Sequence, residues 1–276
     1  MQKSIAIGIR LAAIGAASAL CTGCPDPNTY GTPRTTPVGK ISHTVAAEGF
    51  RYGVDTTNMK TATGAPIAGG SNDSATLPNF PTYQLRIGVL DTLDVGVRVA
   101  NMTSFGADVK WNFIKSDMFD LAIDPGFQAF HFGGSSNGAS SSFTEVYVNA
   151  PLIFGINVAD SVSIVPTVGV TYGLSSISGA NGTGSSAAAS IDGLMFRGGL
   201  GFNFRVTPKF AIQPEFTYLK FLNKDTDPSI SWVIFGIGFN FGALPQYGSA
   251  ETEPAAPAAA APVAAPSPPP TPAPAQ

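Results

Sequence analysis

The chain has 276 residues, a net charge of −3, and only 12% of its residues are Asp, Glu, Lys or Arg, about half of the ~25% usual in soluble proteins. The length suits one barrel or sandwich domain with appendages. Scattered basic residues and a small negative charge argue against nucleic acid as a partner. No run of about 20 apolar residues follows the N-terminal segment, so a helical span does not explain the missing charge. A β-barrel does, because alternate residues of its strands face lipid.

Residues 1–23 are predicted to be an export signal. Lys3 and Arg10 precede the apolar stretch Leu11–Leu20, which has the length of a signal-peptide core and is too short for a spanning helix. Cleavage after Ala19 fits the small residues Ala17-Ser18-Ala19. That cleavage would leave Cys21 and Cys24 to form a disulfide in an oxidising periplasm.

A second cleavage site lies before Cys24. The segment Leu20-Cys21-Thr22-Gly23-Cys24 resembles the lipobox of bacterial lipoproteins, in which small residues precede a cysteine that is lipidated and becomes the first residue. The resemblance implies lipidation of Cys24, although Cys21 stands where Leu is usual. Both cysteines lie at the edge of the signal with no His near them in sequence, so we expect no catalytic role for them.

Two segments are predicted to be disordered. Residues 24–39 contain the stretch PDPNTYGTPRTTPVG, whose prolines, glycines and threonines predict a tether with no packed element. Residues 244–276 form a tail that is almost entirely Ala and Pro from residue 254 onward, a composition that favours extended polyproline II structure. The tail is expected to be an inert extension or a spacer that reaches the cell wall.

Residues 40–243 alternate between apolar and small or polar residues for about ten positions at a time, which is the period of a strand with two different faces. In the segment 232–242, Val233, Phe235 and Phe239 share one face, while Gly236 and Gly238 share the other. The large number of Phe residues, set opposite Gly, favours lipid outside and a crowded lumen inside. The fold class is therefore all-β, a closed antiparallel up-and-down transmembrane barrel.

Ten strands are predicted, with eight or twelve as alternatives because the first is ambiguous. Their approximate ranges are 41–53, 82–90, 94–101, 105–115, 120–131, 143–156, 161–173, 191–206, 209–221 and 230–242. Short polar connections at 90–94, 115–120, 157–161 and 206–209 alternate with longer ones at 54–80, 133–141, 174–190 and 222–229. Short periplasmic turns and longer outer loops are typical of bacterial outer-membrane barrels. An even number of strands places both termini in the periplasm.

This architecture resembles the small bacterial outer-membrane β-barrel proteins. The last strand also resembles the outer-membrane assembly signal, in which aromatic residues follow a glycine at three and five positions. Gly236, Phe239 and Phe241 occupy those positions, and the resemblance implies that the barrel-assembly machinery recognises them. Ile234 and the tail after the strand depart from that signal.

Charged residues alternate inward on several of the predicted strands. A ten-stranded barrel is close to the size at which side chains fill the interior, and unpaired charges there are costly. We therefore predict that opposite charges pair and plug the lumen, whereas a narrow pore is the alternative. The predicted lumen charges are Arg86, Arg98, Asp108, Lys110, Asp120, Asp124, Glu145, Arg197, Arg205 and Glu215.

No enzyme is predicted. His43 and His131 are the only histidines, and neither a Gly-x-Ser-x-Gly motif nor a Cys/His cluster for a metal occurs. No cofactor is expected. The leading hypothesis is a non-enzymatic barrel with a structural or loop-display role, whose loops 54–80 and 174–190 face outward and whose exterior contacts outer-membrane lipids. The alternatives are a narrow passive pore and a soluble periplasmic lipid-binding protein with its apolar stripe turned inward.

Overall fold

A computed structural model describes residues 27–55, 57, 60, 65, 71–100, 104–136, 139–180, 186–222 and 229–245. The described part consists almost entirely of strands. They are β1 (Ile41–Asp55), β2 (Asn72–Leu90), β3 (Leu93–Ala100), β4 (Ser104–Lys115), β5 (Phe119–Ile123), β6 (Gly126–Ser136), β7 (Ala139–Ala159), β8 (Val162–Ala180), β9 (Ser186–Thr207), β10 (Phe210–Phe221) and β11 (Ser229–Gly242). In these ranges no helix is long and apolar enough to cross a membrane.

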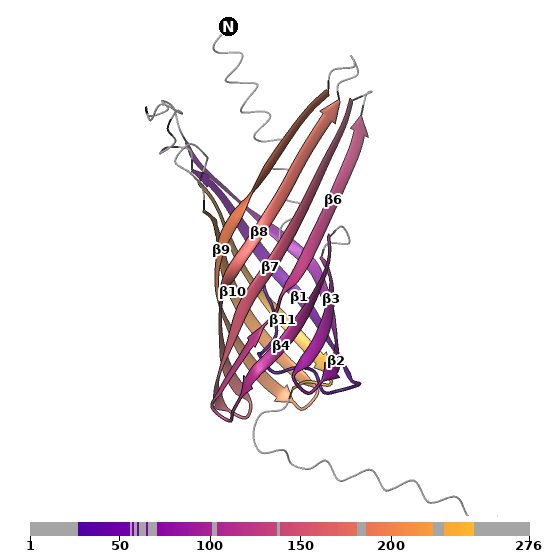
Figure 1. Cartoon of the computed structure of the whole chain (residues 1–276), viewed down its shortest axis with the longest axis vertical. Helices are drawn as coiled ribbons and strands as arrows, with labels where there is room; N and C mark the ends of the chain where they lie inside the picture. The colour runs from indigo at the N-terminus through magenta and orange to yellow at the C-terminus, as the bar shows by residue number, and fades with distance from the viewer. Residues whose placement is uncertain are drawn as a thin grey trace, which may run out of the picture.

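The strands close into an antiparallel barrel with ten positions (Figure 1). Apart from β5 and β6, each strand pairs with its neighbours in the chain, and β1 also pairs with β11 from Ser42 to Asp55. The short strands β5 and β6 share one position, because both pair with β4 and with β7. The predicted closed ten-stranded barrel is confirmed, and closure leaves no strand edge without a partner in the hydrocarbon.

The predicted strand at 120–131 is divided at Asp124 and Pro125. Proline has no N–H to give to a sheet, and the register of the neighbouring pairs changes there. The adjacent groups bond around the break, with the Asp124 N–H donating to the Pro151 carbonyl at 3.0 Å and the Val109 N–H donating to the Pro125 carbonyl at 2.9 Å. Asp124 is buried, as are Ala122 before the break and Gln128 after it, so the same alternate positions face the lumen on both sides of the break.

Apolar side chains face outward and polar ones inward. On β4, Trp111 is 51% exposed while its neighbour Lys110 is 3% exposed. The same alternation holds on β9, where Phe202 and Phe204 are exposed and Asn203 is buried. This arrangement is that of a transmembrane barrel. The alternative of a soluble lipid-binding protein, with the apolar stripe turned inward, is therefore wrong.

The two ends of the barrel differ in height. Four short turns and the ends of β1 and β11 lie at one end, which we call the turn rim; the other end is the loop rim. The four turns fall where the sequence predicts them. At the loop rim, β6 to β9 rise far beyond β3 and β4 (Figure 1).

Parts of the predicted loops 54–80 and 174–190 belong to strands. Residues 72–80 belong to β2, residues 174–180 to β8 and residues 186–190 to β9. The segments of β8 and β9 are rich in Ser and Ala, so they lack the alternation of large apolar and polar residues that marks a strand in sequence. Backbone pairing continues through them, and Ser140 pairs with Ala180 near the top of the β7–β8 ladder.

The half of the lumen toward the loop rim contains an apolar layer. Seven buried side chains pack together there and are partly covered by Tyr52 and Phe221. They are Phe50, Tyr147, Met195, Leu219, Ile230, Trp232 and Ile234. The rest of the lumen is polar and contains the candidate site.

Candidate functional site: a plugged lumen

The segment Pro27–Thr36, which we call the plug segment, runs through the lumen. All of its residues except Gly31 are buried. The prediction of a disordered tether over residues 24–39 is therefore wrong for residues 27–39, while residues 24–26 lie outside the described residues. The segment has no regular secondary structure, and its polar groups bond to side chains of the barrel wall instead.

A tight turn connects the plug segment to β1 at the turn rim. The Lys40 N–H donates to the Pro37 carbonyl at 3.0 Å, and Gly39 has φ of 70°, a conformation that glycine adopts without strain. The plug segment then passes over Gly88 of β2, where a side chain would collide with the Thr36 and Pro37 carbonyls. The chain thus reverses direction between the plug and the first strand.

The end of the plug segment nearest the turn rim is fixed by charge. The Arg34 guanidinium forms an ion pair of 2.9 Å with Asp120 on β5 and donates to the Ser116 carbonyl at 2.7 Å. Both side chains of the ion pair are buried. The Thr36 N–H donates to Asp94 on β3 at 2.8 Å. This end of the plug is therefore held by two carboxylates from separate strands.

Asp94 also belongs to a cluster of buried charges. Arg86 on β2 is 2.8 Å from Asp94, 2.6 Å from Asp108 on β4 and 3.1 Å from Asp124. Lys110 is 3.3 Å from Asp94 and donates to the Thr32 carbonyl of the plug at 3.1 Å. Opposite charges from four positions of the barrel meet beside the plug, which offsets the cost of burying each of them.

Tyr30 is the most constrained residue of the plug. It has φ of 43°, an uncommon conformation for a bulky residue that persists only where neighbouring contacts impose it. Its N–H donates to Glu215 on β10 at 2.8 Å, and its hydroxyl donates to Glu48 on β1 at 2.7 Å. Its ring lies on Gly238 of β11, where a Cβ would be 2.6 Å from the ring. Three strands therefore hold one tyrosine.

The two glutamates that accept hydrogen bonds from Tyr30 also accept hydrogen bonds from other residues of the plug. Glu215 accepts from the Thr29 N–H at 2.7 Å and from the Thr29 hydroxyl at 3.2 Å. Glu48 accepts from the Asn28 amide at 3.2 Å and from the Thr82 hydroxyl of β2 at 3.2 Å. Both carboxylates are buried, and hydrogen bonds to charged groups are among the stronger ones in proteins. The plug thus supplies donors to two buried acids.

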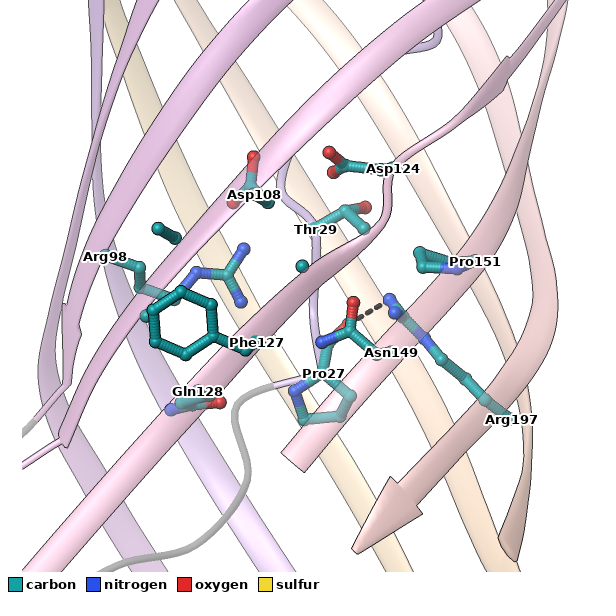
Figure 2. Close-up of a pocket in the computed structure, with 13 residues that line it drawn as sticks. Pro27, Thr29, Arg98, Asp108, Asp124, Phe127, Gln128, Asn149, Pro151 and Arg197 are labelled. Atoms are coloured by element: carbon teal, nitrogen blue, oxygen red, sulfur yellow. Dashed lines mark hydrogen bonds between the residues drawn. The ribbon is translucent and has the colours of Figure 1, made fainter. Parts of the chain in front are cut away.

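The plug ends at a small polar cavity near Pro27 (Figure 2). Arg197 of β9 donates to the Pro27 carbonyl, and Arg98, Gln128 and Asn149 also line the cavity. Its volume of about 20 Å³ gives room for about one water molecule. The side chains that surround the end of the plug come from five strands.

The structure places the ten predicted lumen charges as follows. Arg86, Asp108, Lys110 and Asp124 meet in one cluster, Asp120 pairs with Arg34, and Glu215 and Arg197 bond to the plug. Glu145 is buried on the same strand as Tyr147. Arg98 and Arg205 are half-buried, and each lines a cavity beside the plug.

Four residues central to this site are absent from the sequence-based prediction. Asp94 was assigned to a turn, Glu48 to an ambiguous strand, and Tyr30 and Arg34 to the tether. The signal that could have indicated a filler is the row of small residues on the lumen face, because a bare face leaves volume that folded proteins do not leave empty.

The three residues of the proposed assembly signal lie on β11. Phe239 faces outward and Phe241 is half-exposed, while Gly236 faces the hydroxyl of Tyr30. Recognition by an assembly machinery stays a prediction. Cys24 and residues 246–276 lie outside the described residues, and Leu244, placed in the predicted tail, is buried.

Comparisons with known proteins yield only likenesses of fold. The chain is similar to the outer membrane protease OmpT of Escherichia coli, with 9% identity, a TM-score of 0.49 and coverage of 77% of this chain and 98% of that one. For the translocator domain of the autotransporter NalP of Neisseria meningitidis, the identity is 12%, the TM-score 0.44 and the coverage 87% and 95%. For the attachment invasion locus protein Ail of Yersinia pestis, the identity is 15%, the TM-score 0.34, and the coverage 72% of this chain and 99% of that one. No family model and no curated protein matches the sequence.

Proposed function

We propose that this protein is a non-enzymatic outer-membrane barrel whose lumen is closed by its own N-terminal segment and whose loop rim displays a surface outside the cell. The chain forms an outer-membrane-type β-barrel with salt bridges buried in its lumen. The closure is carried by one observation: Pro27–Thr36 lies inside the barrel and bonds to side chains of six strands, β1, β3, β4, β5, β9 and β10. A structural role follows, because the buried contacts between the plug and the wall stabilise the barrel.

Two layers of lumen side chains favour a closed lumen and argue against a narrow pore. The polar layer contains the plug segment and its paired charges. The apolar layer above it, around Leu219 and Trp232, is buried. An apolar constriction repels water and ions. Charges that form a selectivity ring in a pore would face an open path, whereas Arg86 and Lys110 face carboxylates at contact distance.

Conductance in planar lipid bilayers tests this closure. The full chain is expected to give no steady channels. A variant that lacks residues 27–36 is expected to conduct, since deletion removes the polar filler. A variant that lacks residues 249–276 is the matched control and is expected to stay closed. Should the deleted barrel fail to fold, Tyr30→Ala combined with Arg34→Ala loosens the same segment at two points. Steady channels from the full chain would contradict the proposal.

The raised strands support a display role. Because β6 to β9 extend well beyond β3 and β4 (Figure 1), they carry backbone and side chains away from the membrane. An epitope inserted in the connection at residues 181–185 is expected to be detected by antibody on intact cells. Detection only after the outer membrane has been permeabilised would refute the outward orientation of the loop rim.

The other expected partners stay proposals. Outer-membrane lipids would contact the apolar exterior of the barrel. The barrel-assembly machinery would recognise β11 through Gly236, Phe239 and Phe241. The Pro/Ala tail begins at the turn rim, where a periplasmic spacer would reach the cell wall. Lipidation of Cys24 stays the expected outcome of processing, and cleavage after Ala19 is the alternative.

A further inference from the structure

The contacts of the plug segment give its direction. Starting from the turn rim, Thr36 meets Asp94 and Arg34 meets Asp120, each close to a short turn. Tyr30 then meets Glu48 and Glu215 in the middle of their strands. Read toward the N-terminus, the partners lie steadily farther from the turn rim. The plug segment therefore runs from the turn rim toward the loop rim as it approaches Pro27.

The height of Pro27 can be measured along three strands. Its partner Arg197 lies ten residues before Thr207, where β9 ends at the turn rim. Its neighbours Asn149 and Gly106 lie ten and nine residues from the turn-rim ends of β7 and β4. At ~3.3 Å per residue and a tilt of about 40°, Pro27 stands ~24 Å above the turn rim. This height is most of the hydrocarbon thickness of a barrel.

The wall beside Pro27 is the lowest part of the barrel. β3 ends at Ala100 and β4 begins at Ser104. Gly106, which lines the cavity at Pro27, is only two residues from that end, or ~5 Å in height. On the opposite side, β9 continues eleven residues beyond Arg197. A chain that leaves the lumen near Pro27 therefore finds its shortest exit at the β3–β4 hairpin.

Chain length decides between the two rims. Cys24 precedes Pro27 by three residues, and three residues span at most ~11 Å. This reach covers the distance to the low wall and falls far short of the turn rim. We propose that the chain before Pro27 leaves the barrel at the loop rim beside the β3–β4 hairpin, so that a lipid on Cys24 enters the outer leaflet of the membrane.

This inference differs from the prediction that both termini share the periplasm. The plug runs up the lumen while β11 returns to the turn rim, so the mature N-terminus and the tail end on opposite faces. The proposed outward orientation of the loop rim decides only which of the two termini lies outside the cell. That the two termini lie on opposite faces of the membrane holds in either orientation, so the exit of the chain and the orientation of the barrel can be tested separately.

Cysteine labelling on whole cells tests whether the N-terminus and the tail lie on opposite faces of the membrane. Cys24→Ser removes the lipidation site and leaves Cys21 as the only thiol in the chain, because the sequence has two cysteines. Cleavage after Ala19 then makes Cys21 the second residue of the mature protein. The matched control combines Cys21→Ser, Cys24→Ser and Gln276→Cys, which moves the single thiol to the tail. Each variant is treated with a membrane-impermeant maleimide before and after the outer membrane is permeabilised.

Labelling of Cys21 on intact cells, with labelling of residue 276 only after permeabilisation, is the expected result. If both thiols behave alike in folded protein, the inferred exit is wrong. If residue 276 labels on intact cells and Cys21 does not, the exit holds and the proposed orientation of the barrel fails. Mass spectrometry of the N-terminal peptide of the unaltered protein is expected to show acylated Cys24. An unmodified cysteine there would remove the outer-leaflet anchor.

Discussion

The hydroxyl of Tyr30 donates a hydrogen bond of 2.7 Å to the carboxylate of Glu48, which joins the plug segment to the first strand of the barrel. Glu48 is buried, so water does not replace a lost donor. The strength of this bond is a direct measure of how firmly the plug is held.

Removing that hydroxyl is expected to destabilise the barrel. In Tyr30→Phe the ring still packs on Gly238, but a buried carboxylate loses a donor, which costs about 1–3 kcal/mol. The free energy of unfolding in denaturant, followed by tryptophan fluorescence in lipid vesicles, measures the loss. Tyr172→Phe is the control, because that hydroxyl bonds to Asp192 at an exposed position, where a change within ~0.5 kcal/mol is expected. Equal losses in the two variants would mean that the plug bond adds nothing.

Gly236 is expected to tolerate alanine poorly because of the plug. A Cβ at this position would overlap the Tyr30 hydroxyl and lie 2.8 Å from the Ala47 carbonyl. Gly201→Ala is the matched control on the same lumen face, since its nearest atom would be 3.4 Å away. Overpacking costs about 1–3 kcal/mol, so Gly236→Ala is expected to lower the free energy of unfolding by that amount.

A double-mutant cycle separates plug contact from assembly at this glycine. The cost of Gly236→Ala is expected to shrink in a Tyr30→Ala background, because part of the collision is gone. An undiminished cost would assign the glycine to the backbone of β1 alone. Slower assembly in both backgrounds would instead support recognition of Gly236 by the assembly machinery.

Arg86 is expected to be the most sensitive charge in the lumen. Arg86→Met leaves Asp94, Asp108 and Asp124 without their shared cation, and an uncompensated buried charge costs about 3–5 kcal/mol. Arg51→Met is the control, because Arg51 is exposed. A loss for Arg86→Met no larger than the control's, measured by denaturant unfolding in vesicles, would show that the cluster adapts without its arginine.

The apolar layer makes a prediction of its own. Leu219 is completely buried among Trp232, Met195 and their neighbours, so Leu219→Ala is expected to cost about 2–5 kcal/mol. Leu194→Ala on the exposed outer face is expected to cost less, because lipid fills the space it leaves. If the two leucines cost the same in vesicles, the lumen layer is not packed as a core.

The strands could be predicted from sequence where a large apolar residue alternates with a polar one. Trp111 beside Lys110 and Phe202 beside Asn203 show this pattern, because one partner must face lipid and the other must not. The tall ends of β7, β8 and β9 could not be predicted in the same way. Runs such as Ser140-Ser141-Ser142 have no apolar face, and only backbone pairing makes them strands.

The plug could not be predicted because its stability lies in partners remote from it in sequence. Asn28 and Thr29 bond to Glu48 and Glu215, and the second pair is separated by 186 residues. A segment rich in proline and threonine, with few large apolar residues, predicts a loop. Nothing in its local pattern shows which residues of the barrel it will contact. Asp94 was missed for a related reason. It follows a polar turn directly in sequence, so it was assigned to the turn and not to the lumen face of a strand.

The position of Tyr30 bears on the order in which the barrel forms. Glu48 belongs to β1 and Gly238 to β11, the two strands whose pairing closes the ring. Tyr30 touches both, and it precedes every strand in the chain. A ring that had already closed would require the plug to be threaded through a finished tube. Docking of the tyrosine on the first strand before the last one arrives avoids that passage and gives the final strand a surface on which to register.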